Sequence, residues 1–300
     1  MADKYAVVGN PVKHSLSPEI HRLFAKQTGE EIEYGRILAA EGSTFSLAEG
    51  SLPAEGSLPA EGSFKESVEQ FFDGGGLGLN VTLPFKEHAA QWVHELSTEA
   101  RVAGAVNTIA RLTSRTDRYM GLNTDGLGLI HDLTQNIGLE LKGLKTLILG
   151  AGGACRGIVA PLLQAGVQLH IANRTLSRAH VLVRDLRRLL PRNDDSITVL
   201  SMDACSAGYD LVINATSAAV RGETLHIPAV CSGAFCYDLF YQLGGHTGFC
   251  TLARAQGAED TSDGLGMLVE QAAEAFLIWR GIRPESEEVI NVFRSAQTKN

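Results

Sequence analysis

Cysteine is scarce in this 300-residue sequence, which has five cysteines and none in its first half. Their number is odd, and no two of them form a Cys-x-x-Cys pair. Disulfide-rich domains and structural zinc sites use cysteines that are paired at short, regular spacings. The sequence therefore argues against a disulfide framework and against a structural zinc site, and we expect no bound metal.

The sequence has fewer basic than acidic residues: it contains 26 lysines and arginines and 34 aspartates and glutamates, which gives a net charge of −8. Non-specific binding to nucleic acid or to an acidic membrane surface requires a net basic surface. Neither is therefore an expected partner, although the composition still allows a local basic pocket.

Long apolar runs are missing as well, since no stretch approaches the ~18 residues that a membrane span needs. The opening Met-Ala-Asp-Lys-Tyr has an acidic residue where a secretory signal would be basic, and we expect a cytoplasmic protein. Three Asn-x-Thr triplets, at Asn80, Asn173 and Asn214, match the glycosylation pattern, which matters only on a secreted chain. These asparagines need another explanation.

What the sequence does contain is 44% hydrophobic residues and 32 glycines, which is typical of a globular protein with many tight turns. Its length suggests two domains. The predicted strands are 5–8, 33–38, 77–82, 145–149, 167–172, 197–200 and 210–214, and the predicted helices include 64–72, 176–190 and 265–279. This alternation predicts an α/β fold, with a parallel sheet of βαβ units in the second half.

The segment 40–63 stands apart because Ala-Glu-Gly-Ser recurs in it. Its period of about six residues is far below the ~20 residues of a solenoid repeat, and its small and polar residues bury too little area to offset ordering. We predict a mobile surface loop over a binding element. A deletion that lowers turnover substantially would contradict this prediction.

The clearest ligand-binding pattern is Gly-Ala-Gly-Gly-Ala-Cys-Arg-Gly over 150–157, which leaves a predicted strand and opens a predicted helix. Glycines let backbone N–H groups approach a pyrophosphate, and the helix N-terminus adds free donors and the positive end of the dipole. In this context the motif predicts a dinucleotide site on a Rossmann-type doubly wound sheet. A tight strand-to-helix turn without a ligand is the alternative.

The end of the next strand indicates which dinucleotide is bound. An NAD-preferring site has an acidic residue there for the ribose hydroxyls, whereas this chain has Asn173-Arg174-Thr175 with Arg178 close by. Guanidinium groups pair with a 2′-phosphate, so the sequence favours NADP over NAD; solvated surface arginines are the alternative. The later Asn-Ala-Thr-Ser over 214–217 is expected near the nicotinamide, with a plain polar turn as its alternative.

A substrate site is indicated in the first region. Ser15-Leu16-Ser17-Pro18 stands at a predicted helix start, with Ser17 as the N-cap and Pro18 at the first helical position. Two hydroxyls beside free helix N–H groups would also form a small carboxylate pocket. From the residues alone, the two serines could cap the helix or bind a carboxylate, and both interpretations stay open.

Two charged residues stand at other predicted helix starts. The run Asn-Val-Thr-Leu-Pro-Phe-Lys over 80–86 leads from a strand into a helix whose first turn holds Lys86, where the helix dipole disfavours a cation. Asp125 lies within Asn-Thr-Asp-Gly over 123–126. The misplaced lysine points to acid–base chemistry, with a surface lysine and a capping aspartate as the alternatives.

Taken together, these segments resemble the shikimate dehydrogenase family from Tyr5 to about Ile282. The shared motifs stand in family order at 9–11, 15–18, 80–86, 104–108, 123–126, 150–157, 173–175, 214–217 and 263–268. The resemblance implies an N-terminal α/β substrate-binding catalytic domain over 1–122, completed by C-terminal helices over 265–300. It also implies a Rossmann-type NADP-binding domain over 123–264.

The activity implied by the resemblance is the reversible NADPH-dependent reduction of 3-dehydroshikimate to shikimate, a step toward chorismate and the aromatic amino acids. Lys86 and Asp125 would form the catalytic pair. Ser15 and Ser17 would hold the substrate carboxylate. The ring hydroxyls would be bound by Thr82, Lys86, Asn107, Asp125 and Gln271. The NADP site would be lined by Gly150, Ala151, Gly152, Gly153, Ala154, Asn173, Arg174, Thr175, Arg178, Thr216, Leu239, Tyr241 and Gly264.

The chain departs from the family pattern at three places. They are the 40–63 repeat, Ala219 near a usual glycine, and Thr-Gly-Phe over 247–249 in place of Thr-Pro-Phe. None of them removes a residue assigned above. The last one leaves the rigidity of the loop near Tyr241 open, because replacing proline by glycine loosens the chain.

Three related functions compete with this interpretation. An enzyme acting on quinate, or on both quinate and shikimate, often prefers NAD, which Arg174 argues against. A sensor that binds shikimate without turnover would share the fold, but Lys86 and Asp125 disfavour it. A folate dehydrogenase of similar architecture leaves the serine pair and Asn107 unexplained. The sequence does not fix the oligomeric state, and a homodimer is among the assemblies it allows.

Overall fold

The computed structural model describes residues 2–40, 57–58, 62–112, 118–189, 197–218 and 226–297. Most of the predicted mobile loop, and Ala219, lie outside these ranges. Within the described ranges, no helix is both long enough and apolar enough to span a bilayer.

The chain folds into two compact units. Unit 1 comprises Met1–Thr124 and Ala272–Glu285, and unit 2 comprises Asp125–Gln271 and Ser286–Asn300. The sequence prediction assigned all of 265–300 to the first domain. In the structure, α9 (Leu265–Arg280) begins in unit 2 and ends in unit 1, and α10 (Ser286–Gln297) is grouped with unit 2. A hydrogen bond of 2.5 Å from the Ser286 hydroxyl to Glu270 ties α10 to the first part of α9.

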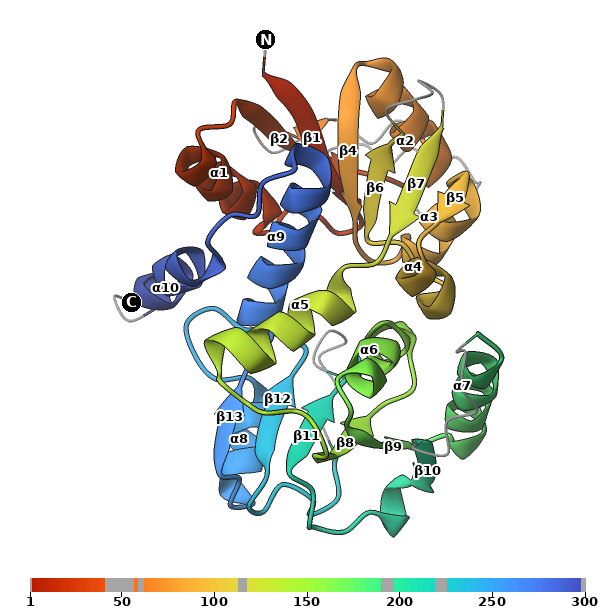
Figure 1. The fold of residues 1–300 in the computed structure, drawn as a ribbon, viewed down its shortest axis with the longest axis vertical. Helices are drawn as coiled ribbons and strands as arrows, with labels where there is room; N and C mark the ends of the chain where they lie inside the picture. Colours follow the sequence, from red (N-terminus) through yellow and green to blue (C-terminus); the bar gives the residue numbers. More distant parts are fainter. Residues whose placement is uncertain are drawn as a thin grey trace, which may run out of the picture. The chain divides into compact units, whose positions relative to one another are not determined.

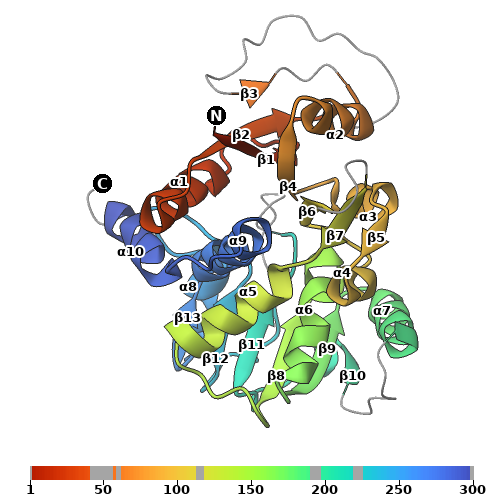
Figure 2. The ribbon, with the colours of Figure 1, turned by 45° about the horizontal axis from the view of Figure 1, so that its top comes forward.

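Unit 1 is built on one seven-stranded sheet (Figures 1 and 2). Its strands are β1 (Asp3–Gly9), β2 (Ile32–Leu38), β3 (Ser57–Leu58), β4 (Gly76–Val81), β5 (Glu95–Leu96), β6 (Thr108–Arg111) and β7 (Tyr119–Leu122). Its helices are α1 (Ser17–Thr28), α2 (Phe64–Asp73), α3 (Lys86–Trp92), α4 (Thr98–Ala103) and the last part of α9. The Ser63 hydroxyl and the Glu66 carboxylate form a capping box that starts α2.

The strand order in unit 1 brings several loops to one edge of the sheet. The order is β3-β2-β1-β4-β6-β7-β5, in which β1 is parallel to β2 and β4. Strand β6 is antiparallel to β4, with Asn80 opposite Thr108. The start of β6 therefore lies beside the carboxyl ends of β1 and β4. Buried Val8, Leu79 and Ile109 of these three strands share one apolar core.

Part of the low-complexity segment belongs to this sheet. Ser57–Leu58 form β3, which pairs in parallel with β2 at its edge, as Figure 2 shows. Ala40 and Ser63 form an isolated parallel bridge at the two ends of the segment. The predicted surface loop is thus interrupted by a short strand, and the prediction that it is mobile falls on residues outside the described part.

Unit 2 is a six-stranded parallel sheet with helices (Figure 1). Its strands are β8 (Lys145–Leu149), β9 (Gln168–Asn173), β10 (Ile197–Ser201), β11 (Leu211–Asn214), β12 (Phe235–Asp238) and β13 (Asp260–Ser262). Its helical segments are α5 (Asp125–His131), a turn of π-helix η1 (Asp132–Asn136), α6 (Gly153–Gln164), α7 (Leu176–Leu189), a 3-10 turn η2 (Met202–Ala204), α8 (Gly248–Ala255), the first part of α9, and α10.

The strand order of unit 2 is β10-β9-β8-β11-β12-β13, with all neighbours parallel. This is the dinucleotide-binding order, in which the chain reverses its direction of travel across the sheet beside the first strand, β8. The α/β fold class with a Rossmann-type second domain is confirmed. The continuous apolar run of β8 reflects burial on both faces, because Leu147, Ile148 and Leu149 are all fully buried.

Candidate active site

The predicted substrate residues of unit 1 lie at the sheet edge described above. The residues placed there are Ser15, Ser17, Thr82, Lys86 and Asn107. Backbone hydrogen bonds join the loops that carry them: the N–H of Asn10 donates to the Leu83 carbonyl, and the N–H of Val106 donates to the Lys86 carbonyl, each over 2.9 Å. The fold therefore gathers side chains that are far apart in the sequence.

Asn107 is held rigidly at this edge. It is only 2% exposed, and its amide nitrogen donates to the Thr124 hydroxyl over 2.9 Å. The backbone N–H of Thr124 donates back to the side-chain amide oxygen (Oδ1) of Asn107, also over 2.9 Å. This pair of bonds fixes the residue that immediately precedes Asp125.

The two remaining predicted substrate residues belong to unit 2. Asp125 is its first residue and begins α5, as predicted, and Gln271 of α9 is the last residue before the chain returns to unit 1. Both side chains are half-buried. The predicted pair Lys86 and Asp125 is thus divided between the two units, with Lys86 in unit 1.

Asn80, at the end of β4, organises a buried network under the unit 1 site. Its amide oxygen accepts hydrogen bonds from the Tyr34 hydroxyl over 2.6 Å and from the His21 ring over 3.2 Å. Its amide nitrogen donates to the Asn107 carbonyl over 3.3 Å and to the Thr108 hydroxyl over 3.2 Å. A buried amide with these partners explains one of the three Asn-x-Thr triplets without glycosylation.

Burial sets the protonation of the aromatic groups in this network. Burial lowers the pKa of His21 to about 3, against the weaker opposing effect of its bond to Asn80. The ring is therefore neutral, and Nε2 carries the proton that Asn80 accepts. Burial also raises the pKa of Tyr34 well above its usual value, and the Tyr34 hydroxyl hydrogen-bonds Ser17.

The prediction that Ser17 caps α1 is wrong. The N-cap position is Leu16, with no side-chain cap, and Ser17 is already the first helical residue. The Ser17 hydroxyl is used elsewhere, because it accepts from the Ser15 hydroxyl over 3.2 Å and bonds Tyr34. The Ser15 hydroxyl accepts from the backbone N–H of Ser17 over 3.3 Å, and the N-cap Leu16 provides no side-chain cap. A carboxylate pocket would use the other N–H groups of this first turn.

Lys86 lies in the first turn of a helix, as predicted; it is the first residue of α3, and its side chain is half-buried. A turn precedes α3: the carbonyl of Thr82 accepts a hydrogen bond from the N–H of Phe85 over 3.0 Å. A Cβ at Gly9 would overlap the Thr82 side chain, so the glycine lets the two loops approach closely.

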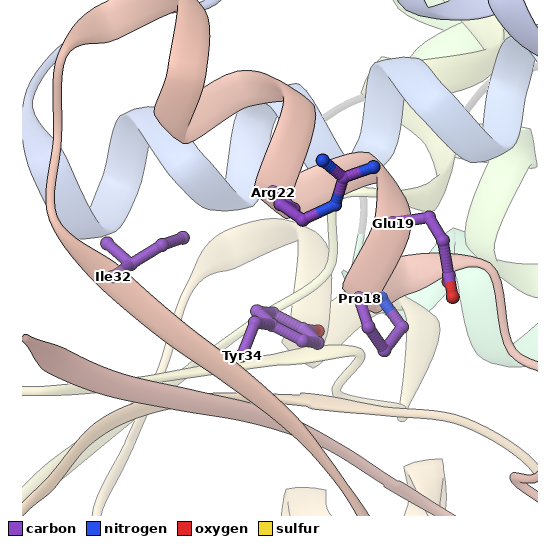
Figure 3. Close-up of a pocket in the computed structure, with 5 residues that line it drawn as sticks. All are labelled: Pro18, Glu19, Arg22, Ile32 and Tyr34. Atoms are coloured by element: carbon purple, nitrogen blue, oxygen red, sulfur yellow. The ribbon is translucent and has the colours of Figure 1, made fainter. Parts of the chain in front are cut away.

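A pocket of about 220 Å³ lies between α1 and β2 and is lined by Pro18, Glu19, Arg22, Ile32 and Tyr34 (Figure 3). None of the residues predicted to bind substrate lines it. Glu19 in its wall is paired with Arg36 over 3.0 Å. We therefore place the candidate site at the sheet edge, where the predicted polar side chains gather, and not in this pocket.

In unit 2, the predicted glycine turn connects β8 to α6. Gly150 has a φ of 109°, and a Cβ there would lie 2.9 Å from the Ala215 carbonyl oxygen, so the fold itself requires glycine. A Cβ at Gly152 or Gly153 would meet no atom of the described chain within 4 Å. Glycine at these two positions leaves open space directly at the uncapped N-terminus of α6. This space and the free N–H donors fit a pyrophosphate.

The residues after β9 fit a 2′-phosphate. Asn173 folds the turn by donating to the Thr175 carbonyl over 2.8 Å, which explains a second Asn-x-Thr triplet. Arg174 and Arg178 are both exposed. Arg174 directly follows β9, and Arg178 lies in the first turn of α7, where its N–H donates to the Thr175 carbonyl over 3.0 Å.

The third Asn-x-Thr triplet lies at the end of β11. Asn214 is buried, donates to the Asp238 carboxylate over 2.8 Å, and accepts from the Thr216 hydroxyl over 2.8 Å. The N–H of Leu239 donates to the Asn214 carbonyl over 3.0 Å. These bonds hold Thr216 and Leu239 at neighbouring strand ends.

Gly264 and Tyr241 complete the predicted cofactor residues at this edge. A Cβ at Gly264 would overlap the Leu239 carbonyl, so the chain entering α9 passes directly over the loop after β12. Tyr241 in this loop is half-buried, and burial raises the pKa of its hydroxyl. Thr247 caps α8, so the glycine that replaces the usual proline is the first residue of that helix.

The sequence did not identify the buried residues that hold the site residues in place through hydrogen bonds. His21, Tyr34 and Asn80 do so in unit 1, and Asp238 does so in unit 2. Asn80 was marked by its Asn-x-Thr triplet and by the 80–86 motif, but not as a support of the site, and Asp238 was marked only by the apolar residues before it. His21 and Tyr34 carried no signal, because the sequence does not show that they stack on each other at 4.3 Å between ring centres.

Three family models match this chain. A shikimate dehydrogenase substrate binding domain matches residues 7–109, a shikimate / quinate 5-dehydrogenase model matches 132–221, and a shikimate 5′-dehydrogenase C-terminal domain matches 264–292. Together they cover well over half of the sequence and include both units.

Individual proteins agree with the family models. A shikimate dehydrogenase (NADP(+)) of Hahella chejuensis is 46% identical over 291 residues, with 96% of this chain and 97% of that protein covered. The crystal structure of an Ael1 enzyme from Pseudomonas putida has a TM-score of 0.82 at 38% identity and covers 97% of this chain and 98% of that one. Shikimate 5-dehydrogenase of Thermus thermophilus, solved with NADP(H) and shikimate, has a TM-score of 0.77 at 29% identity, covering 98% and 99%.

Proposed function

This chain belongs to the shikimate dehydrogenase family, and on that premise we propose that it catalyses the reversible, NADPH-dependent reduction of 3-dehydroshikimate to shikimate in the shikimate pathway. The observation that carries the proposal is the sheet edge of unit 1, where two serine hydroxyls, Thr82, Lys86 and Asn107 lie on loops joined by hydrogen bonds. These are the groups that a small, polyhydroxylated carboxylate requires.

The substrate carboxylate binds to the hydroxyls of Ser15 and Ser17 and to the uncapped first turn of α1. The Tyr34 hydroxyl fixes Ser17 from the buried side. Asn107 is rigid because Thr124 bonds both ends of its amide, so it presents a fixed edge to a ring hydroxyl. Thr82, Asp125 and Gln271 bind the other hydroxyls of the ring.

The reaction needs a hydride and a proton, and the bound NADPH supplies the hydride. Lys86 donates the proton to the carbonyl oxygen of 3-dehydroshikimate, or takes it back from the shikimate hydroxyl in the reverse direction. Its positive charge also stabilises the alkoxide that develops on that oxygen. Asp125 accepts a hydrogen bond from a ring hydroxyl of the substrate and so helps to orient the ring.

The unit 2 edge holds the dinucleotide. The backbone N–H groups from Gly150 to Ala154 bind the pyrophosphate at the N-terminus of α6, where Gly152 and Gly153 leave the space for it. Arg174 and Arg178, with Asn173 and Thr175, bind the 2′-phosphate of the adenosine half. Thr216, Leu239, Tyr241 and Gly264, at the ends of β11, β12 and β13, line the nicotinamide half.

The direct test follows reduced nicotinamide by its near-ultraviolet absorbance when the purified protein is mixed with shikimate and NADP. Sustained reduction of NADP is the expected result. Absence of reduction, with shikimate still bound in a calorimeter, would instead establish a shikimate sensor. The presence of both Lys86 and Asp125 favours the enzyme.

Three finer statements remain predictions. The family model that matches the second region names both shikimate and quinate, and Arg174 favours the NADP-dependent shikimate enzyme over a quinate enzyme that prefers NAD. A homodimer is tested by light scattering of the purified protein. A cytoplasmic location is tested by cell fractionation.

A further inference from the structure

A cluster of four polar side chains in unit 2, three of them buried, has no part in the chemistry described above. It consists of Asp132, Asn136, Tyr237 and Glu270, which we call the anchor cluster. Asp132 and Tyr237 are fully buried, and Glu270 is 1% exposed. Burying two carboxylates side by side is costly, so the cluster needs a physical explanation.

Hydrogen bonds connect all four members. The Tyr237 hydroxyl donates to Asp132 over 2.6 Å. The Asn136 amide donates to both carboxylates, over 2.9 Å to Asp132 and 2.8 Å to Glu270. The Tyr237 hydroxyl in turn accepts from the backbone N–H of Met267 over 3.3 Å. The four side chains are thus connected to one another and, through Tyr237, to the backbone of α9 at Met267.

The members come from the elements that carry proposed substrate and cofactor residues. Asp132 and Asn136 belong to η1, which continues α5 directly from Asp125. Glu270 is the neighbour of Gln271 on α9. Tyr237 lies in β12, whose following loop holds the proposed cofactor residues. The anchor cluster therefore joins the three elements at one point.

Backbone packing shows how closely α5 and α9 are joined, and Figures 1 and 2 both show them side by side. A Cβ at Gly128 would lie 2.7 Å from the backbone nitrogen of Gln271 and 2.9 Å from the Met267 carbonyl. A Cβ at Gly266 would overlap the Asp132 carboxylate itself. The two helices are therefore packed with their backbones in close contact, and neither glycine position has room for a side chain.

We propose that the anchor cluster is a positioning device: Tyr237 and Asp132 lock the first turns of α9 against α5 and so hold Gln271 and Asp125 at the spacing that the substrate ring requires. The proposal deepens the proposed function and rests on it. Asp132 and Tyr237 touch neither substrate nor cofactor in this account, and they act only through the two helices.

The test is Tyr237→Phe, which removes the hydroxyl and leaves the ring. We expect kcat/KM for shikimate to fall by ~10-fold or more, because small misplacements of positioning groups are costly, with a raised KM for shikimate and nearly unchanged NADP affinity. The matched control is Tyr209→Phe, which removes a buried hydroxyl bonded to His170 over 3.0 Å in the same unit. It should leave the kinetics unchanged.

A double-variant cycle separates positioning from simple destabilisation. If Tyr237 acts through Gln271, the loss caused by Tyr237→Phe is much smaller in a Gln271→Ala background. Fully multiplicative losses, or a lower Tm with normal kinetics well below it, would overturn the proposal. If Tyr237→Phe does not fold, Asn136→Ala replaces it, because Asn136 is exposed. This variant must also lower kcat/KM and raise KM for shikimate, by a smaller factor. Inactivity of the unaltered protein would instead refute the proposed function itself.

Discussion

At the scale of single residues, the account depends most on Lys86. We expect Lys86→Ala to lower kcat by ~10²-fold or more with little change in KM, because general acid–base catalysis contributes at least that much and the substrate retains its other ligands. Steady-state kinetics with shikimate and NADP measures both constants. Lys65→Ala, on exposed Lys65 of α2, is the matched control. A large change in KM alone would make Lys86 a binding residue.

Arg174 decides the choice between the two dinucleotides. We expect Arg174→Ala to weaken NADP binding by ~1.5–3 kcal/mol and to spare NAD, because the guanidinium loses a charged hydrogen bond to the 2′-phosphate that NAD lacks. Calorimetric titration with each dinucleotide measures the two affinities. Arg184→Ala, at an exposed position on α7, removes the same charge and should leave both affinities unchanged. Equal losses for NADP and NAD in Arg174→Ala would refute the assignment.

His21 makes the stability of the protein depend on pH. Its pKa is 6.5 when unfolded and about 3 when folded, so between these values the unfolded chain binds more protons and stability falls as the pH falls. At pH 5 this loss is about 2 kcal/mol relative to neutral pH. Urea unfolding at both pH values should show a loss smaller by that amount in His21→Gln. An equal pH dependence of the two proteins would mean that His21 is not buried as a neutral ring.

Individual residues differed in how far the sequence could predict them. Lys86 was predicted in the first turn of a helix and Asp125 at a helix start, and the structure places both there, because the strand, turn and glycine signals around them are local. The role of Ser17 was predicted wrongly, because α1 begins one residue earlier than Pro18 indicates. Leu16 therefore occupies the N-cap position, and Ser17 is the first helical residue.

At the scale of elements, the turn between β8 and α6 offers a matched pair of glycines. Gly150→Ala should destabilise the protein by ~1–3 kcal/mol, because alanine would have to adopt a positive φ against the Ala215 carbonyl. Gly152→Ala meets no described atom within 4 Å and costs no more than about 1 kcal/mol at a helix N-cap, yet it should weaken NADP binding.

Urea unfolding without cofactor and calorimetric titration with NADP separate these two effects. Undiminished NADP affinity in Gly152→Ala would show that the pyrophosphate does not approach the chain at this turn. A fully stable Gly150→Ala would mean that the turn does not need a positive φ at that position.

Elements with a clear apolar pattern were predictable. Strand 145–149 and helix 265–279 were predicted within one residue of β8 and α9, and the four-residue strand β11 was predicted as 210–214. By contrast, Phe-Cys-Tyr-Asp over 235–238 was not predicted to form β12. Its residues give no apolar run comparable to Leu-Val-Ile in β11, and in the structure β12 pairs with β11 and β13 on its two sides.

At the scale of the whole molecule, the α/β class and the Rossmann-type second unit followed from the sequence, because alternating strands and helices leave few arrangements. The mixed sheet of unit 1 did not follow. Its antiparallel β6 and β7 are short, and nothing in their residues sets the direction in which they pair. The division of α9 between the units was also missed, because one continuous helix gives no sequence signal where it passes between two cores.

The substrate and the cofactor are tested together by the near-ultraviolet absorbance of reduced nicotinamide, measured with the purified protein in four mixtures that combine shikimate or quinate with NADP or NAD. We expect fast reduction only with shikimate and NADP, since the serine pair, Lys86 and Asn107 bind the substrate and Arg174 selects the 2′-phosphate. Faster reduction with quinate or with NAD would contradict the assigned specificity. No reduction in any mixture, with shikimate still bound, would contradict the assignment of Lys86 to catalysis.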